Sequence, residues 1–395
     1  MTAVPLDLSP PPVPPGPRPL PERRCAVPPS RLGGRPMLPP ALRTVWRSGS
    51  ALQLGLDPAR AVVLDGVDEP LVRALLDLDG TRTEPEVLAA AADAGVDPLA
   101  FGAVLTQLRA GGLLAEAGPG TAARGSPAAD AVRTSRAFGA PAAAGRLGPD
   151  LASLSLLEDA AAPLDVLRRR RRATVLVHGA GRVGVGAATL LAAAGVGRVH
   201  VADRGPVRPG DVAPGGFTAA DVDRSRSGAA AEALRRAAPE AQTGPAPPGR
   251  RPELVLLAGA DPVGGELRGV LHAGRVPHLP AGVRETTAVV GPLVVPGLTS
   301  CLRCADLHRT DRDPAWPVVA AQLAGVRRRR EEPCDVVLAS VAASVAALQS
   351  LALLDGRPAA AAGATLELAL SDGRLRRRRW APHRRCGCGA GTLGP

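Results

Sequence analysis

The stretch TVLVHGAGRVG, residues 174–184, decides the fold of this chain. Its first five residues predict a buried strand, its glycines a tight turn, and the alanine- and leucine-rich run after it a helix. A second strand follows and ends in the acid Asp203. A strand, a glycine turn, a helix, a second strand and an acid in this order are typical of a dinucleotide-type nucleotide-binding unit.

Each glycine of the turn has a separate expected role. Gly179 allows the tight turn, Gly181 lets the backbone approach a pyrophosphate, and Gly184 lets the helix pack on the strand. The free N–H groups of the helix N-terminus would bind phosphate, and Asp203 would bind the ribose hydroxyls. The alternative is a glycine-rich strand-to-helix turn that binds nothing.

Length and composition limit the remaining possibilities. A chain of 395 residues suits two or three domains. Aromatic residues make up only 2%, and tyrosine, lysine, isoleucine and asparagine are absent, so the core must consist of Leu, Val and Ala. The net charge of +11 comes from arginine, which is densest at residues 168–172, 327–330 and 376–379. No aromatic residues alternate with these runs to stack on bases, so we expect solvated surface and no nucleic-acid partner.

Two apolar or proline-rich segments bear on localisation. Residues 1–36 are rich in proline, lack the features of a signal peptide and are predicted to be a disordered tail. Residues 336–354 are uncharged, but alanine, serine and Gln349 favour a buried or interface helix over a membrane span. The sequence therefore predicts a cytoplasmic protein without a membrane segment, whose cysteines are thiols or metal ligands.

Residues 37–118 are predicted to form a small winged-helix-like front module. Two short strands, 51–56 and 61–64, precede three helices marked by a capping box at Thr83, by Asp97-Pro98 and by terminal glycines. A short strand at Leu113-Leu114 closes the module. Residues 119–165 are rich in Gly, Ala and Pro and are interpreted as a linker, and residues 166–395 as the nucleotide-binding domain.

Two cysteine pairs form the second chemical signal. Cys301 and Cys304 make a C-x-x-C knuckle, and Cys386 and Cys388 a tighter pair near the end of the chain. Four thiolates can complete a tetrahedral structural zinc site that staples the C-terminal tail to the domain. Unligated surface thiols or a redox pair are the alternatives. Of the other two cysteines, Cys25 has no evident partner, and Cys334 is expected to be a buried structural thiol.

Together, the glycine turn, the acid and the cysteine pairs resemble the ThiF/MoeB/HesA group, which shares the fold of ubiquitin-activating enzymes. The resemblance covers residues 168–389. The segments CLRCADLHRTDRDPAW (residues 301–316) and RCGC (residues 385–388), behind the front module, look like a narrower branch. That branch comprises the cyclodehydratase-type, leader-peptide-binding proteins of thiazole/oxazole-modified peptide pathways, mostly in actinobacteria.

The chain departs from the pattern of active members in this group. The resemblance implies adenylation of a C-terminal carboxylate with Mg-ATP by an Asn, an Arg, a Lys and a metal-binding Asp. Here Asp211 occupies the position of the Asn and Pro214 the position of the Arg. Arg226 is the nearest equivalent of the missing lysine. The metal ligand falls at Ala260, or at Asp261 if the loop shifts by one residue. Arginine is not interchangeable with lysine at a tight catalytic centre, so these losses indicate a degenerate catalyst.

The leading hypothesis is therefore a homodimeric protein that recognises a precursor peptide through its front module. It would present this peptide to a separate ATP-using cyclase. One alternative is an ATP-dependent adenylyltransferase of a sulfur-carrier or ubiquitin-like protein, with Arg226 and Asp261 as catalytic candidates. Another is an NAD-dependent oxidoreductase, because the glycine turn and Asp203 would serve NAD equally well.

Overall fold

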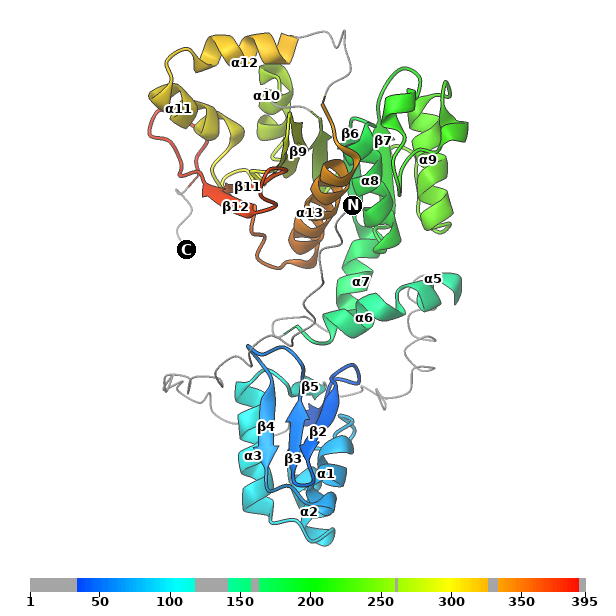
Figure 1. Cartoon of the computed structure of the whole chain (residues 1–395), viewed down its shortest axis with the longest axis vertical. Coiled ribbons are helices and arrows are strands. Elements are labelled where there is room, and N and C mark those ends of the chain that lie inside the picture. Colours follow the sequence, from blue (N-terminus) through cyan, green and yellow to red (C-terminus); the bar gives the residue numbers. More distant parts are fainter. Residues whose placement is uncertain (1–33, 118–140, 158–162, 260–261, 326–332, 391–395) are drawn as a thin grey trace, which may run out of the picture.

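A seven-stranded mixed sheet organises the larger part of the chain (Figure 1). The computed structural model describes residues 34–117, 141–157, 163–259, 262–325 and 333–390. The strand order is β12-β11-β10-β9-β8-β6-β7, in which β7, β6, β8 and β9 are parallel and the rest antiparallel. The strands are β6 (Thr174–His178), β7 (Arg198–Ala202), β8 (Leu254–Ala258), β9 (His278–Arg284), β10 (Thr287–Val290), β11 (Ala364–Ala369) and β12 (Leu375–Arg379).

Helices cover this sheet and complete an α/β domain, as the sequence predicts. They are α8 (Arg182–Ala193), α9 (Arg226–Ala237), α10 (Gly265–Ala273), α11 (Leu302–Arg312), α12 (Trp316–Gly325) and α13 (Val336–Asp355). The core is built almost wholly of Val, Leu and Ala, and small residues bring α8 and α13 close together. A Cβ atom on Gly186 of α8 would lie 3.2 Å from the Cβ of Ala343 on α13.

Within the described residues, α13 is the helix long and apolar enough to cross a membrane. Half of its apolar window is buried, and six of its residues between Leu338 and Ala347 belong to the domain core. The sequence-based interpretation of a buried helix agrees with this packing. Cys334, one residue before the Asp335 cap of α13, is half-buried against the same core.

The front module has its own apolar core, formed by residues between Leu52 and Leu114. A three-stranded sheet, β2-β3-β4, packs on three helices, and β1 pairs with β5. The predicted helices lie where their caps indicate: Thr83 and Glu86 form the capping box, and Asp97 caps the third helix. The elements are β1 (Arg35–Met37), β2 (Thr44–Ser48), β3 (Ala51–Leu54), β4 (Val62–Asp65), α1 (Glu69–Leu76), α2 (Glu84–Asp93), α3 (Pro98–Ala110) and β5 (Ala115–Ala117).

Part of the segment interpreted as a linker is helical. It contains α5 (Pro141–Arg146) and α6 (Gly148–Leu154), and α7 (Pro163–Arg172) begins within it. Ala143, Leu147 and Leu154 pack with Val166 and Leu167 in a small apolar cluster. These side chains are three or four residues apart and so form one face of a helix. The high content of Gly, Ala and Pro makes this pattern hard to recognise in the sequence. In Figure 1 these helices lie between the front module and the large domain.

Candidate functional site

The glycine turn joins β6 to α8, as the sequence predicts. Gly179 has a φ of 104°, in the left-handed region, and a Cβ there would approach the Ala258 carbonyl oxygen to 2.3 Å. A Cβ on Gly184 would lie 2.0 Å from the Gly179 carbonyl oxygen. Glycine is therefore required at both positions, by close packing of strand, turn and helix.

Gly181 plays a different part, because it is the N-cap of α8 and has open space at its Cβ position. No side chain caps this helix, so the first-turn N–H groups remain open to an anion, which a helix N-terminus attracts. The open space beside Gly181 is where a phosphate group would approach the backbone.

Asp203, Asp211 and Arg226 are brought together beside this turn. Asp203 follows β7, and its carboxylate accepts hydrogen bonds from the N–H groups of Ala180 (2.7 Å) and Arg204 (2.7 Å). Arg226, the first residue of α9, donates from Nη1 to Asp203 at 3.1 Å and from Nη2 to Asp211. Its Nε donates to the Pro206 carbonyl oxygen at 2.9 Å.

This geometry changes the expected role of two residues. Arg226 pairs with Asp211 and lessens the repulsion between this acid and a phosphate, although the one guanidinium is shared by two carboxylates. All three nitrogens of the Arg226 guanidinium are already hydrogen-bonded, and the side chain is only 12% exposed. Arg226 therefore holds the site together in this structure, because three of its five N–H groups are directed at protein oxygens and only two are left for a phosphate. Asp261 lies outside the described residues.

A cavity of about 790 Å³ lies next to the glycine turn, at the carboxyl ends of β8 and β9. His178 at the end of β6 and the first residues of α10 line it, as does α11. Asp306 of α11 lines its wall, where it pairs with Arg268 and with Arg309 at 3.1 Å. Ligands of open α/β sheets bind in the crevice beyond the carboxyl ends of the strands, which is the position of this cavity.

On the same side of the cavity, Arg309 lies against two tryptophan rings, and one of them, Trp380, belongs to the C-terminal part of the chain. The Arg309 guanidinium lies 5.0 Å from the Trp316 ring centroid and 4.9 Å from that of Trp380. Trp316 also donates from Nε1 to Asp306 at 3.2 Å. The sequence marked segment 301–316 only by its resemblance to a family. It did not predict the ion pair between Asp306 and Arg268, because these residues are far apart in the chain.

The four predicted cysteine ligands lie together, with all their sulfur atoms within 4.8 Å of one another. Cys301 caps α11 and Cys304 lies in its first turn, whereas Cys386 and Cys388 follow β12. The Cys301–Cys304, Cys301–Cys386 and Cys304–Cys388 sulfurs are separated by 3.8, 3.6 and 3.6 Å. Tetrahedral thiolates about 2.3 Å from zinc are roughly 3.8 Å apart, so the cluster has the size of a metal site.

Without a cation, two of the four thiols, Cys301 and Cys386, resist ionisation. Burial raises the pKa of the Cys301 thiol, helped by the neighbouring thiols, and burial raises the pKa of Cys386 to about 11. Burial acts in the same direction on Cys388, but hydrogen bonds from the Ala390 amide and the neighbouring thiols lower its pKa. A bound cation would supply the charge that the thiolates need.

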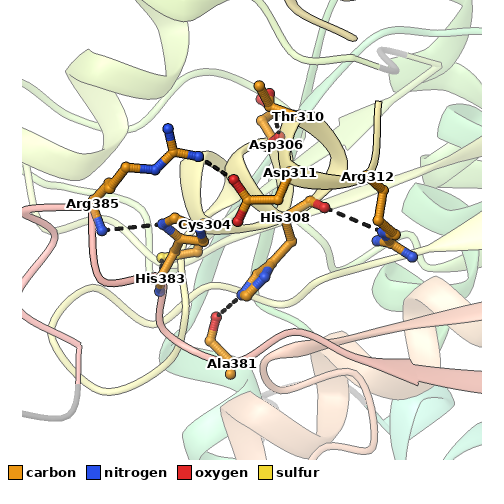
Figure 2. Close-up of polar contacts among 9 residues, drawn as sticks. All are labelled: Cys304, Asp306, His308, Thr310, Asp311, Arg312, Ala381, His383 and Arg385. Carbon is orange, nitrogen blue, oxygen red and sulfur yellow. Dashed lines mark hydrogen bonds and ion pairs between the residues drawn. The ribbon is translucent and has the colours of Figure 1, made fainter. Parts of the chain in front are cut away.

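A polar clamp beside the cluster holds the C-terminal segment on α11 (Figure 2). Asp311 accepts a hydrogen bond from His383 Nε2 at 2.7 Å and pairs with Arg385. His383 donates its backbone N–H to the Cys304 sulfur at 3.3 Å, and its Nδ1 accepts the Arg385 N–H at 3.1 Å. His308 Nε2 donates to the Ala381 carbonyl oxygen at 3.0 Å.

These hydrogen bonds bear on whether His308, Asp311 and His383 form a second metal site, because their ligand atoms also lie within 4.8 Å. A metal-bound histidine normally donates its other ring N–H to a neighbouring acceptor. The Nδ1 of His383 instead accepts an N–H, which leaves its proton on Nε2, directed at Asp311. The three residues thus act as a clamp that positions the cysteine-bearing segment.

The comparisons with known proteins agree with this fold and with the resemblance drawn from sequence. Residues 155–248, which include the glycine turn, Asp203 and Arg226, match the model of the ThiF family. The ThiF-type resemblance is confirmed for this part of the chain. No curated protein matches it significantly.

Solved structures are similar over almost the whole chain. E. coli MccB in complex with MccA-N7isoASN has a TM-score of 0.65 at 14% identity, covering 90% of this chain and 99% of MccB. E. coli MccB with ATP has a TM-score of 0.65 at 15% identity, covering 89% and 99%. PaaA has a TM-score of 0.56 at 16% identity, covering 86% and 98%. At these identities the likeness establishes a shared fold, front module included.

Proposed function

We propose that this protein recognises a precursor peptide through its front module and that its ThiF-type domain no longer adenylates efficiently. The protein would act as the cyclodehydratase component of an azole- or azoline-forming peptide pathway and hand the peptide to a separate ATP-using cyclase. The observation that carries the peptide assignment is a fold shared from end to end with MccB. MccB itself is crystallised with MccA, a precursor peptide.

Within the described part of the chain, the front module offers two free strand edges for such a peptide. In the β2-β3-β4 sheet, β3 is central, so an added strand would pair with β2 or β4. Peptides that add a strand gain affinity from main-chain hydrogen bonds and specificity from alternate side chains. The β2 edge carries Trp46, which is 53% exposed, and the C-terminal end of α3 contacts β4 through Gly111 and Val62.

The ion pairs of Arg226 support the second part of the proposal, which is that the ThiF-type domain no longer adenylates efficiently. The nearest equivalent of the lysine in active members is committed to Asp203, Asp211 and a carbonyl oxygen. Phosphoryl and nucleotidyl transfer depend on positive groups already positioned at the transferring phosphate. A guanidinium held by two carboxylates is a poor substitute. ATP binding at the glycine turn is still compatible with this geometry.

The ATP-dependent adenylyltransferase remains the second candidate, because one observation favours it. Arg226 pairs with Asp211, so this acid would repel a triphosphate less strongly, and MccB is crystallised with ATP. In that case Arg226 would keep its pair with Asp211 and donate its remaining N–H groups to the nucleotide. The ThiF match supports this adenylyltransferase candidate more than it supports the NAD-dependent oxidoreductase.

We further propose that the four cysteines hold one structural zinc ion and that the protein is a cytoplasmic homodimer. Zinc is favoured because four thiolates in a closed cluster are a frequent structural zinc site. The polar clamp at Asp311 would keep the second cysteine pair in place. The large domain would carry the dimer contact and leave the front module free for the peptide.

A binding experiment tests the peptide assignment. Labelled precursor peptides encoded next to this gene would be titrated against the full chain and against a chain that begins at Pro141. We expect only the full chain to bind. Unchanged metal content and an unchanged melting transition of the large domain would show that the shortened chain is folded. Equal binding by both chains would assign recognition to the large domain instead.

A further inference from the structure

Strand β12 forms an arginine-rich free edge of the large sheet, at the far end from β7 (Figure 1). Among the residues that the structure describes it pairs only with β11, and all five of its residues are exposed. Four of the five are arginines, from Arg376 to Arg379. The edge therefore combines unpaired backbone groups with a row of positive charges.

The charge on this edge is only partly neutralised. Residues 374–385 contain seven arginines, and no carboxylate side chain follows Asp372 in the sequence. Asp372 pairs with Arg376, Glu367 with Arg378 at 3.6 Å, and Asp311 with Arg385. These three carboxylates leave an excess of positive charge over a short stretch of surface.

The other guanidinium groups of this stretch contact neutral groups or solvent. Arg377 donates from Nε to the Ala360 carbonyl oxygen at 2.7 Å. Arg374, Arg379 and Arg384 have no side-chain ion pair among the described residues. Such a surplus of cations attracts anions and steers their approach.

The geometry of the strand indicates the kind of anion. Side chains two residues apart share a face and are spaced about 6.6 Å apart along a strand. Arg377 and Arg379 thus lie on one face of the edge, and Arg376 and Arg378 on the other, where Arg378 lies 5.9 Å from the Trp380 ring centroid. An extended peptide with alternating acidic residues repeats at the same spacing. Opposite charges on paired strands stabilise each other.

Nucleic acid fits this surface less well. Binding of single strands relies on aromatic rings that stack on bases, in addition to positive charge. The one aromatic residue beside the edge, Trp380, is only 5% exposed, and Arg309, Arg312 and Arg378 lie within 6 Å of its ring. Its face is therefore not open to a base.

We propose that the β12 edge binds an acidic, extended peptide segment by strand addition, at a site separate from the front module. Backbone hydrogen bonds to β12 would fix the register, and carboxylates of the segment would pair with the arginines. The opposing interpretation is that arginines on a free edge merely prevent pairing with other sheets, as charges on edge strands do.

The test uses the full-length protein and a fluorescein-labelled peptide of about eight residues that alternates glutamate with valine. Fluorescence polarisation should show salt-sensitive binding, and a glutamine-valine peptide should bind about tenfold more weakly. The double substitution Arg374→Gln/Arg379→Gln should weaken binding to a similar extent. Neither side chain has an ion-pair partner among the described residues, so the fold should tolerate this change.

Three controls make the test decisive. The variant Arg235→Gln/Arg236→Gln removes the same charge from α9, beside β7, and should bind like the wild type. N-methylation of alternate peptide amides should abolish binding in one pattern and spare it in the other, because only every second N–H of an added strand faces β12. Equal binding of both methylated peptides, or of both charge variants, would overturn the proposal. Competition by single-stranded DNA at the same concentration as the acidic peptide would reassign the edge to polyanions in general.

Discussion

Single glycines control the nucleotide-binding turn for different physical reasons, and this difference predicts different mutant behaviour. Gly184→Ala places a Cβ 2.0 Å from the Gly179 carbonyl oxygen and 2.9 Å from the Ala258 Cβ. Overpacking of this kind costs about 1–3 kcal/mol. We expect a lower free energy of unfolding, measured by urea denaturation.

Gly181→Ala is the matched control, because its added Cβ meets no atom within 4 Å. This variant should unfold like the wild type but bind ATP more weakly, since the methyl group occupies the space that a phosphate would use. Calorimetric titration with ATP measures the second effect. Equal stability of both variants would contradict the packing role of Gly184.

The cysteine cluster predicts one equivalent of zinc per chain. Cys301→Ser and Cys386→Ser should each lose the metal and lower the melting temperature, because a structural zinc ion stabilises only the folded state. Elemental analysis and thermal unfolding measure the two effects. Cys334→Ser changes a cysteine outside the cluster and should keep the metal. A wild-type protein that melts normally without metal would refute the assignment.

Sequence spacing could predict the glycines and the cysteines, but not the ion pairs around them. The glycine turn is local, and the two cysteine pairs carry a recognisable ligand spacing. Arg226 is 23 residues from Asp203 and 15 from Asp211, and nothing in the sequence indicates that it joins them. The Asp306–Arg268 ion pair and the polar clamp at Asp311 were missed for the same reason.

Among the elements, α7 and α13 are joined by a buried ion pair. Arg170 donates from Nε and Nη2 to the two Asp355 carboxylate oxygens at 2.8 and 2.7 Å, and the side chains are 5% and 0% exposed. From the sequence, the whole arginine run 168–172 was expected to be solvated surface, because runs of like charge are usually exposed to solvent. Periodicity along α7 turns one arginine of the run towards the core.

Breaking this pair should destabilise the large domain strongly. Asp355→Ala leaves a buried guanidinium with little compensation, and such losses cost about 3–5 kcal/mol. The double variant Arg170→Met/Asp355→Leu should lose much less, since the one charge left without its partner, Arg357, is 26% exposed and can turn to solvent. Chemical denaturation compares the two, and equal losses would show that packing, rather than charge, sets the effect.

The front module shows why some elements are predictable and others are not. The helix caps and two of the short strands, predicted at 51–56 and 61–64, were visible in the sequence. β2 was not predicted, because every residue of this edge strand is exposed and no alternation marks it. Its presence matters for function, since it makes β3 central and moves the free edges to β2 and β4.

An isolated front module should therefore fold and carry the peptide-binding edge. Its apolar core lies within residues 52–114, although so small a domain has only modest stability. A fragment of residues 34–117, which keeps β1, would be titrated with precursor peptides and followed by heteronuclear NMR. Shifts concentrated in β2 or β4 are expected. A folded fragment that binds no peptide, while the large domain does, would contradict the assignment.

For the whole molecule, the described parts divide into a front module and a large α/β domain, with helices α5 to α7 between them (Figure 1). Composition predicted the Leu, Val and Ala core of both. The arginine runs 168–172 and 376–379 were visible in the sequence, but not that the first places Arg170 in the core and the second forms an edge strand of the sheet. The two proposed peptide sites, on the front module and on β12, lie in different parts of the molecule.

The most direct test of the central claim is peptide-dependent exchange of pyrophosphate into ATP, measured on the full-length protein with a precursor peptide that it binds. Recognition without efficient adenylation predicts no exchange above background, since Arg226 is held by Asp203 and Asp211. Exchange at a rate comparable to that of an adenylating relative, and abolished by Arg226→Ala, would contradict the account and establish the protein as an adenylyltransferase.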